Sequence, residues 1–236
     1  MHTRRLFLNR LDPTPEPRDA VVVIDVLRSF STAAYAFAAG ASVIYPVETI
    51  AEACRLQQQI PNAATTGAIA GGDPVAGFDF GNSPTALQAA RLAGRPLIQS
   101  TAAGVRGLTR YRHARALFAG SLVSARATAK ALLELRPREV CFVITGEWVD
   151  RDGDEDIACA DYLDALLQGR APDPAQYAER VKNSDFGRQF QAGTNPSLPP
   201  GDLALCAQAN RFDFALRATH VDGHLQLQRF NVVQQK

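Results

Sequence analysis

The chain has 236 residues, enough for one large domain or two small ones, and 46% of them are hydrophobic, as in a globular protein with a substantial core. Its 25 basic and 24 acidic residues give a net charge of +1 without a basic run, so we expect no nucleic-acid partner. No apolar stretch approaches the roughly 20 residues of a membrane span, and the N-terminal segment lacks the apolar core of a signal peptide, so we expect a cytoplasmic protein without a membrane partner.

The four cysteines are widely spaced and form no C-x-x-C pair. A zinc site would need closer cysteine or histidine pairs, and a disulfide framework is typical of smaller chains that are dense in cysteine. We therefore predict reduced and mostly buried thiols at Cys54, Cys141, Cys159 and Cys206.

Short apolar runs alternate with helical patterns from the N-terminus to residue 169. The run over 20–25, AVVVID, is continuous and rich in β-branched residues, which is typical of a strand buried on both faces of a parallel sheet. Gly40 and Pro61 follow two helical patterns and would end those helices. In chain order we predict a strand over 5–9, a proline-rich loop over 12–19, a strand over 20–25, a helix over 31–40, a strand over 42–47, helices over 48–60 and 83–94, strands over 95–100 and 114–120, a helix over 121–135, a strand over 139–145 and a helix over 155–169.

This alternation predicts an α/β fold, a three-layer α/β/α sandwich around a mostly parallel sheet. Beyond residue 169 the chain becomes polar, with prolines, glycines and short helical patterns. Two runs of alternating hydrophobicity then flank Asp222 and Gly223, and an Asp-Gly pair between such runs is a strong hairpin signal. We expect this hairpin, over 213–230, to make the sheet mixed at an edge of a single domain, 1–236. A division into two lobes stays open.

An acid and an arginine follow the first buried strand, in the stretch VVVIDVLRSF. Ligands of open α/β sheets bind beyond the carboxyl ends of the strands, where Asp25 would lie. Arg28 offers a two-pronged donor for a phosphate or carboxylate, and Ser29 lies where a helix begins, whose free N–H groups favour an anion. We predict that Asp25 holds a hard cation while Arg28 holds the anion that the cation also touches. The alternative is a buried Asp25–Arg28 ion pair.

A second candidate is the stretch GFDFGNSPTAL over 77–87. Ser83 is a favoured N-cap and Pro84 a favoured first helical residue, which accounts for this pair structurally. The functional interpretation places Asn82, Ser83 and the start of the helix around an anionic oxygen.

The third candidate is the loop QSTAAGVRGL over 99–108, a strand end followed by small residues. Small side chains let main-chain N–H groups approach a phosphate, so Ser100, Thr101 and Gly104 are candidate ligands. Arg106 is either a second anion ligand or a surface residue. Neither a P-loop nor a G-x-G-x-x-G motif is present, which disfavours nucleotide binding by those means.

The fourth candidate is the acidic segment over 145–161. An EF-hand starting at Asp150 is excluded because its sixth position, where glycine is required, is Glu155. Asp154 is a good N-cap, and acids in the first turn complement the helix dipole, which is the structural alternative. The functional interpretation joins Glu155 and Asp156 to Asp25 on Mg²⁺, an ion that takes one or two carboxylates together with water and substrate oxygens.

Three of these segments together resemble one known family. VVVIDVLRSFST resembles Val-Ile-Asp-Val-Leu-Arg-Ala-Thr-Ser-Thr, GFDFGNSP resembles Gly-Phe-Asp-x-Gly-Asn-Ser-Pro, and EDIACADYL resembles Glu-Asp-x-x-Cys-Ala-Gly. The order and spacing are similar over residues 20–168 to those of the 2-phosphosulfolactate phosphatases, the ComB family. The resemblance implies a Mg²⁺-dependent phosphatase on an α/β sandwich, which hydrolyses (R)-2-phospho-3-sulfolactate to sulfolactate and phosphate in coenzyme M biosynthesis.

The chain departs from the family pattern at three places. Ala68 follows Gly67 where the family has a glutamate, the 100–104 loop lacks the family's asparagine, and Asp161 stands where glycine is common. These changes weaken the inference of substrate identity and metal stoichiometry more than that of the fold. We expect Asp25 with Glu155 or Asp156 to hold Mg²⁺ while water, or alternatively Asp25, attacks phosphorus.

Two rival functions stay open from sequence. One is a cysteine hydrolase similar to isochorismatases, although Cys141 within a strand and Cys159 within a helix are poorly placed as exposed nucleophiles. The other is a family member that binds a small anion or phosphoester without turnover, for want of an acid at Ala68. The sequence also leaves a homodimer open.

Overall fold

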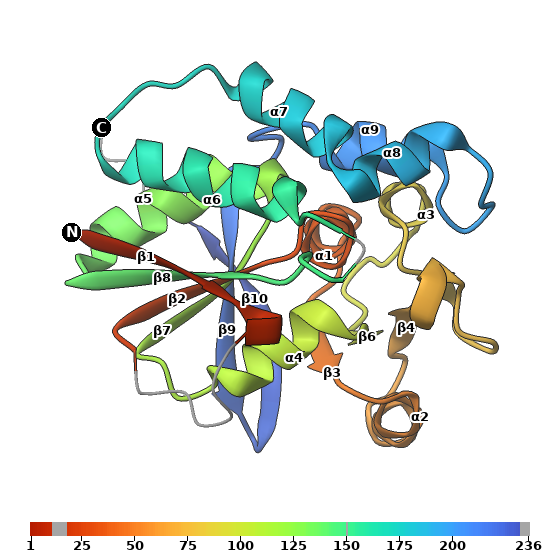
Figure 1. The fold of residues 1–236 in the computed structure, drawn as a ribbon. Coiled ribbons are helices and arrows are strands. Elements are labelled where there is room, and N and C mark those ends of the chain that lie inside the picture. Colours follow the sequence, from red (N-terminus) through yellow and green to blue (C-terminus); the bar gives the residue numbers. More distant parts are fainter. Residues whose placement is uncertain (11–17, 150, 232–236) are drawn as a thin grey trace.

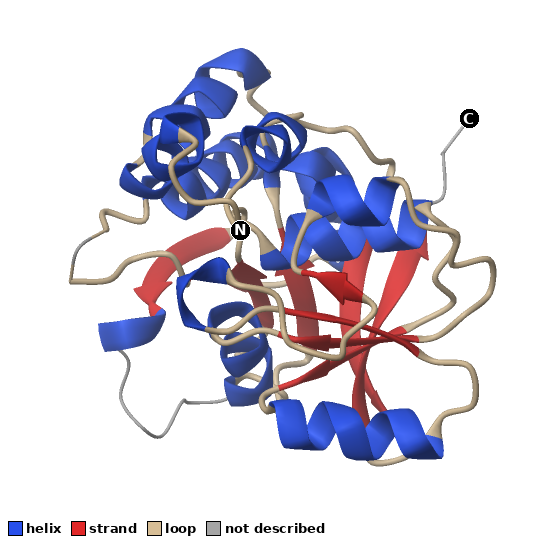
Figure 2. Cartoon of the chain, turned by 90° about the vertical axis from the view of Figure 1, so that its right-hand side faces the viewer, coloured by secondary structure: helices blue, strands red, loops and turns tan. Residues whose placement is uncertain are grey.

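The computed structural model describes residues 1–10, 18–149 and 151–231. Most of the proline-rich loop predicted over 12–19, and Asp150 of the acidic segment, lie outside the described residues. Within the described part, ten strands form one mixed sheet in the order β1-β8-β2-β7-β9-β10-β3-β6-β4-β5. Helices lie above and below this sheet (Figures 1 and 2), which confirms the predicted three-layer α/β architecture.

The first half of the sheet is built from four parallel strands. Their central member, the AVVVI run, has all five residues buried, because helices cover both faces of the sheet there. Neighbouring residues are paired in register, with Ile24 opposite Gly120 on one side and Ile144 on the other. The four strands are β1 (His2–Phe7), β8 (Glu139–Ile144), β2 (Ala20–Ile24) and β7 (Ala116–Gly120).

The second half is a shorter parallel set, which joins the first through the C-terminal hairpin. Its strands are β3 (Ile44–Val47), β6 (Leu97–Ser100), β4 (Ala64–Gly67) and β5 (Phe80–Gly81).

The predicted hairpin is present, but it does not lie at an edge. Its strands, β9 (Phe214–Val221) and β10 (His224–Asn231), flank the turn at Asp222 and Gly223, where both residues have positive φ. Strand β9 pairs antiparallel with β7, and β10 pairs antiparallel with β3, so the hairpin occupies the middle of the sheet. The expectation of an antiparallel edge was wrong, because alternating hydrophobicity predicts the two strands of a hairpin but does not predict which other strands pair with them.

Three apolar cores of described residues fill the space between helices and sheet. The first lies against β2, β7 and β8 under α5 (Ala125–Leu135) and α6 (Asp154–Leu167), and the second lies on the other face under α1 (Ser29–Ala38). The third lies under α2 (Ile50–Gln59), the helix at the lower right of Figure 1. The remaining helices are α3 (Pro84–Gln88), α4 (Ala103–Arg110), α7 (Pro174–Asn183), α8 (Asp185–Ala192) and α9 (Pro200–Cys206), with 3₁₀ turns η1 (Leu8–Arg10), η2 (Ala70–Gly72) and η3 (Leu122–Ser124).

Two predicted segments have different secondary structure. The helix expected over 83–94 ends at Gln88, because the N–H groups of Leu92 and Gly94 donate to the carbonyls of residues 39 and 40 instead of continuing the helix. The small-residue loop expected over 99–108 is mostly the helix α4.

The two halves of the sheet meet where the functional residues lie. Three antiparallel pairings, β7 with β9, β9 with β10 and β10 with β3, lie between the two halves of the sheet. Because β6 is parallel to β3 and β2 is parallel to β7, the direction of β6 is opposite to that of β2. Sheet twist nevertheless brings their carboxyl ends together. A Cβ on Gly104, just after β6, would lie 2.8 Å from Oδ2 of Asp25, just after β2. Among the described residues, no helix combines the length and apolarity that crossing a membrane requires.

Candidate active site

Asp25 directly follows β2 and lies four residues before the start of α1. Its carboxylate accepts a hydrogen bond from the N–H of Ser29 at 3.0 Å, and its carbonyl accepts one from Phe30 at 3.1 Å. The first N–H groups of α1 are therefore bound by Asp25, and they do not form the open anion site that the sequence suggested. Asp25 is only 6% exposed, and this burial raises the pKa of its carboxyl group.

Asp156 joins the ends of two neighbouring strands. One carboxylate oxygen accepts from the N–H of Val26 at 2.8 Å, and the other accepts from the N–H groups of Thr145 at 3.0 Å and Gly146 at 2.8 Å. Burial, followed by the charges of Glu155 and Asp25, raises the pKa of Asp156 well above its ordinary value. Because both of its oxygens are already engaged, Asp156 positions the two loops and has little capacity left for another ligand.

Glu155 is the second acid of the α6 N-terminus and is 1% exposed. Its Oε2 is buried and has no hydrogen-bond partner among the described residues. A Cβ on Gly146 would lie 2.4 Å from its Oε1, so only glycine leaves room for this carboxylate. Burial raises the pKa of Glu155 to about 7, while the charge of Arg151 lowers it.

Arg28 is buried, and it pairs with a carboxylate that the sequence did not suggest. Its guanidinium donates to Asp202 at 2.7 Å, to the carbonyl of Ser197 at 2.9 Å and to that of Gly72 at 3.2 Å. It also lies over the ring of Phe190, 5.3 Å from the centroid. The alternative Asp25–Arg28 ion pair is therefore replaced by an Arg28–Asp202 pair, and three protein acceptors hold the arginine in place.

Asp202 also connects Arg28 to the turn before α3. It accepts from the hydroxyl of Ser83 at 2.7 Å and from the N–H of Thr85 at 3.0 Å. Ser83 additionally caps α3 by accepting from the N–H of Ala86 at 3.2 Å, as its N-cap pattern predicts. The structure thus brings the 82–84 turn beside the residues that follow Asp25.

The remaining candidates differ in their surroundings. Asn82 and Thr101 are buried, and their Oδ1 and Oγ1 atoms have no partner within the described chain. Ser100 is buried at the end of β6, where its carbonyl accepts from Ala68 at 3.2 Å. Arg106 is exposed and donates to Asn9 at 3.3 Å. It is therefore a surface residue, which was the structural alternative to a role as an anion ligand.

Arg151 is a charged residue near the acids that the sequence analysis did not single out. It lies on the loop before α6, with its guanidinium 4.6 Å from the ring centroid of Phe186. Its charge lowers the pKa of both Asp25 and Glu155. Asp202 was missed for the same reason, because neither residue belongs to a local motif and both act on groups far away in sequence.

The buried acids are the side chains to consider as ligands of a cation. No group of three or more His, Cys, Asp or Glu side chains is arranged to hold a metal within the described residues. The buried Oε2 of Glu155, which has no hydrogen-bond partner among the described residues, is the carboxylate atom that could bind one, and the Oδ2 atom of Asp25 lies close to Gly104. Mg²⁺ would need only one or two such carboxylates, because water and substrate oxygens complete its coordination shell.

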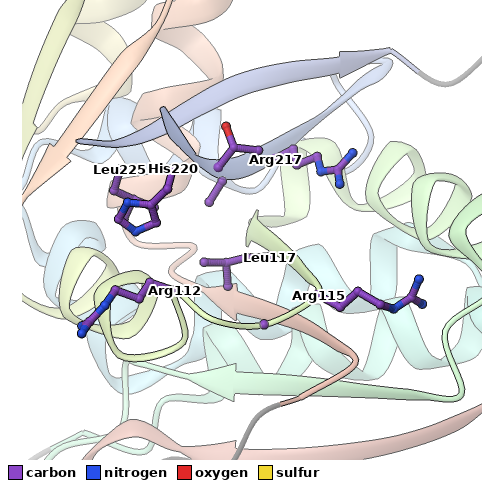
Figure 3. A pocket seen from close by; sticks show the side chains of 9 residues that line it. Arg112, Arg115, Leu117, Arg217, His220 and Leu225 are labelled. Carbon is purple, nitrogen blue, oxygen red and sulfur yellow. The ribbon is translucent and has the colours of Figure 1, made fainter. Parts of the chain in front are cut away.

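A separate pocket of about 170 Å³ lies at the opposite end of β7. Its lining includes Arg112, Arg115 and Arg217, and in Figure 3 Arg112 extends to one side of the pocket while Arg115 and Arg217 extend to the other. Arg115 pairs with Asp19, and Arg217 lies over the ring of Phe230. The pocket therefore gathers no positive charge at one point, and we place the site at Asp25.

The cysteines give no candidate nucleophile at this site. Cys141, Cys159 and Cys206 are buried free thiols and Cys54 is exposed, in agreement with the prediction of mostly buried cysteines. Burial raises the pKa of Cys141 to about 11 and that of Cys159 well above its ordinary value. Both stay protonated near neutral pH, which argues against the cysteine-hydrolase alternative.

Comparison with known proteins decides the family. The profile of the 2-phosphosulpholactate phosphatase family matches residues 7–217 of the chain. The chain belongs to this family. It therefore belongs to a group of phosphoric monoester hydrolases, and the resemblance drawn from the three motifs is confirmed.

Named relatives agree with this assignment to the 2-phosphosulfolactate phosphatase family. A probable 2-phosphosulfolactate phosphatase of Bacillus subtilis is 31% identical over 202 residues, which cover 85% of this chain and 87% of the relative. One from Carboxydothermus hydrogenoformans is 44% identical over 218 residues, covering 88% and 87% respectively. One from Synechococcus sp. is 38% identical over 159 residues, covering 66% and 64%.

Proposed function

We propose that this protein is a Mg²⁺-dependent cytoplasmic phosphatase of a small phosphoester, either 2-phosphosulfolactate or a related 2-phospho acid, which it hydrolyses to the alcohol and phosphate. The observation that carries the proposal is a group of three buried acids in a phosphatase-family fold: Asp25 directly after β2, and Glu155 and Asp156 in the first turn of α6, where Asp156 accepts from residues after β2 and β8. Buried carboxylates raise one another's pKa unless a cation balances them, and a metal-assisted phosphatase uses such a cation.

Asp25 and Glu155 would hold the metal, and Asp156 would keep the β2 and β8 loops in place around it. When bound, Mg²⁺ supplies positive charge opposite the phosphate oxygens. The unpartnered hydroxyl of Thr101 can donate a hydrogen bond to the same oxygens, whereas the unpartnered Oδ1 of Asn82 can only accept one, from water or from a hydroxyl of the substrate. Arg28 contributes by orienting the turn after β2 through Asp202, in place of the direct phosphate contact expected from sequence.

Hydrolysis adds one water across the ester. The water oxygen forms a bond to phosphorus, the bond from phosphorus to the ester oxygen breaks, and the leaving alcohol carries away a proton of the water. Asp25 is the alternative nucleophile, in which case a phospho-aspartate forms first and water releases phosphate from it. In both routes the buried position of Asp25 excludes bulk water from its carboxylate.

Phosphate release from a panel of phosphoesters with Mg²⁺ tests the proposal. We expect Asp25→Asn to lower kcat by on the order of 100-fold or more, because it removes a charge aimed at the reacting group. Asp173→Asn is the matched control, since Asp173 is exposed at the start of α7 and accepts from the N–H of Ala175 at 2.9 Å. Equal rates for wild type and Asp25→Asn would remove Asp25 from the chemistry.

Ala68 favours a second candidate function, binding of a small anion or phosphoester without turnover. It follows β4 beside the site loop, with its N–H bonded to the carbonyl of Ser100, and its methyl group offers no carboxylate. Thermal stabilisation by phosphoesters, with no phosphate released from any of them, would favour this alternative.

A further inference from the structure

Gln99 is a buried polar residue of β6 that has no part in the mechanism described so far. Its side chain is fully buried, and its amide nitrogen donates to the main-chain carbonyl of Ser29 at 2.8 Å. Because a carbonyl can only accept a hydrogen bond, the nitrogen of the amide must face it, which sets the orientation of the side chain. Gln99 therefore connects β6, in the second half of the sheet, to the first residue of α1, which lies 70 residues earlier in the chain.

The hydrogen bond from Gln99 holds one edge of a peptide unit whose other edge is held by Asp25. The carbonyl of Ser29 and the N–H of Phe30 belong to the same planar peptide, and this N–H donates to the carbonyl of Asp25 at 3.1 Å. The N–H of Ser29 itself donates to Oδ1 of the Asp25 carboxylate at 3.0 Å. A shift of this peptide would therefore move both N–H groups that bind Asp25.

The segment that follows Gln99 also confines the other carboxylate oxygen of Asp25. A Cβ on Gly104 would lie 2.8 Å from Oδ2 of Asp25 and 2.9 Å from Cζ of Phe30, so the start of α4 packs directly against both residues. Oδ1 is thus bound by the N–H of a residue that Gln99 holds, while Oδ2 lies against Gly104. The β6–α4 segment therefore defines the direction of this carboxylate, although Asp25 belongs to the other half of the sheet.

We propose that Gln99 is a positioning residue of the phosphatase reaction, which orients the Asp25 carboxylate through its hydrogen bond to the Ser29 carbonyl. This inference rests on the proposed function, in which Asp25 holds the metal or attacks phosphorus. Gln99 acts through Ser29 and needs no contact with the substrate. Accurate placement of reacting groups contributes strongly to the rate, and a misplacement of about 1 Å can cost on the order of 100-fold.

Gln99→Met tests this role, because it removes the amide donor and keeps an unbranched side chain of similar length. With 2-phospholactate and saturating Mg²⁺, we expect it to lower kcat by roughly 10-fold and to change KM by less than about threefold, since the contacts with the substrate remain. Gln99→Asn keeps an amide but is one methylene shorter, so its nitrogen falls short of the Ser29 carbonyl and kcat should fall similarly. Urea denaturation identifies any variant that is not folded, and the two variants give the same comparison independently.

Gln226→Met is the matched control. Gln226 lies on β10 of the same sheet, is 8% exposed, and donates to the hydroxyl of Tyr45 at 3.5 Å. Its amide oxygen accepts from Gln228 at 3.3 Å, so these bonds connect it to strands and not to the start of α1. The substitution removes a buried amide in the same way, and kcat and KM should both stay within about twofold of wild type.

Amide hydrogen exchange keeps this inference separate from the proposed function, because it reports on the bond between Ser29 and Asp25 without turnover. In Gln99→Met the amide of Ser29 should exchange about 10-fold faster than in wild type, while that of Val143 in β8 should not change. If wild type releases no phosphate yet exchange at Ser29 rises in this way, the phosphatase proposal fails and the positioning of Asp25 stands. Unchanged exchange at Ser29, an unchanged kcat where wild type is active, or an equal loss of kcat in Gln226→Met overturns the inference.

Discussion

Removal of Asp202 should destabilise the protein strongly, because it leaves several buried donors without a partner. The Arg28 and Asp202 side chains are 4% and 0% exposed, so water cannot replace the lost carboxylate. Asp202→Ala leaves three donors without their acceptor: a guanidinium N–H of Arg28, the hydroxyl of Ser83 and the N–H of Thr85. Breaking a buried ion pair by removing one partner costs about 3–5 kcal/mol.

That loss corresponds to a fall in Tm of roughly 6 to 20 °C for a chain of this size. Urea denaturation followed by far-ultraviolet circular dichroism measures the free energy of unfolding directly. Fluorescence is less suitable, because Trp148 is the only tryptophan and is 51% exposed on the loop before α6. Glu179→Ala is the matched control, since it breaks an exposed pair with Lys182 and should cost less than about 1 kcal/mol.

A double variant separates the charge from the packing. Arg28→Met with Asp202→Leu replaces the buried pair by apolar side chains and should recover part of the stability that Asp202→Ala loses, since well-packed hydrophobic replacements of buried ion pairs are often neutral, while Ser83 and Thr85 stay without their acceptor. A loss below about 1 kcal/mol in Asp202→Ala, or a double variant no more stable than that single variant, would refute the reasoning.

Two other predictions concern the acids of the site. The pKa of Glu155 is raised from 4.5 to about 7, so the folded state holds this proton more tightly than the unfolded chain does. As pH rises from 4.5 to 7 without metal, the protein should therefore lose about 3 kcal/mol of its free energy of unfolding. Urea denaturation with EDTA at pH 5 and pH 8 should show Glu155→Gln gaining on wild type by about that amount at pH 8, and an equal difference at both pH values would contradict the assigned cause. Gly146→Ala, whose Cβ would lie 2.4 Å from Glu155, should cost about 1–3 kcal/mol and reduce phosphate release, whereas Gly201→Ala, whose nearest contact is 3.3 Å, should do neither.

Features encoded within a few neighbouring residues were predictable. The buried run of β2 requires only its own composition, and Asp25 follows from its position at the end of that run. Ser83 acts as the N-cap of α3, and the turn at Asp222 and Gly223 forms a hairpin, because each depends on local backbone geometry. The acidic start of α6 was likewise predictable from neighbouring residues. The different roles of Glu155 and Asp156 were not, because they depend on which distant groups each carboxylate contacts.

Features that depend on distant partners could not be predicted. Asp202 lies 174 residues after Arg28 and has no neighbour that marks it as an ion-pair partner. The sequence showed Arg28 beside Asp25, and proximity along the chain made an anion-binding or ion-pairing role with Asp25 the natural expectation. Only the packing of α9 against α3 shows that the guanidinium turns toward Asp202.

The central position of the hairpin explains how the site is assembled from both halves of the sheet. Five strand-to-strand steps separate β2 from β6, and a twist of roughly 20–25° per step rotates one relative to the other by about 100–125°. Because β6 also runs in the opposite sense, this rotation directs its carboxyl end back toward that of β2. The contact between Gly104 and Asp25 is the result. A hairpin at an edge would have left β2 and β6 with fewer steps between them and less twist, so the inserted β9–β10 pair is part of what brings the 100–104 segment to the acids.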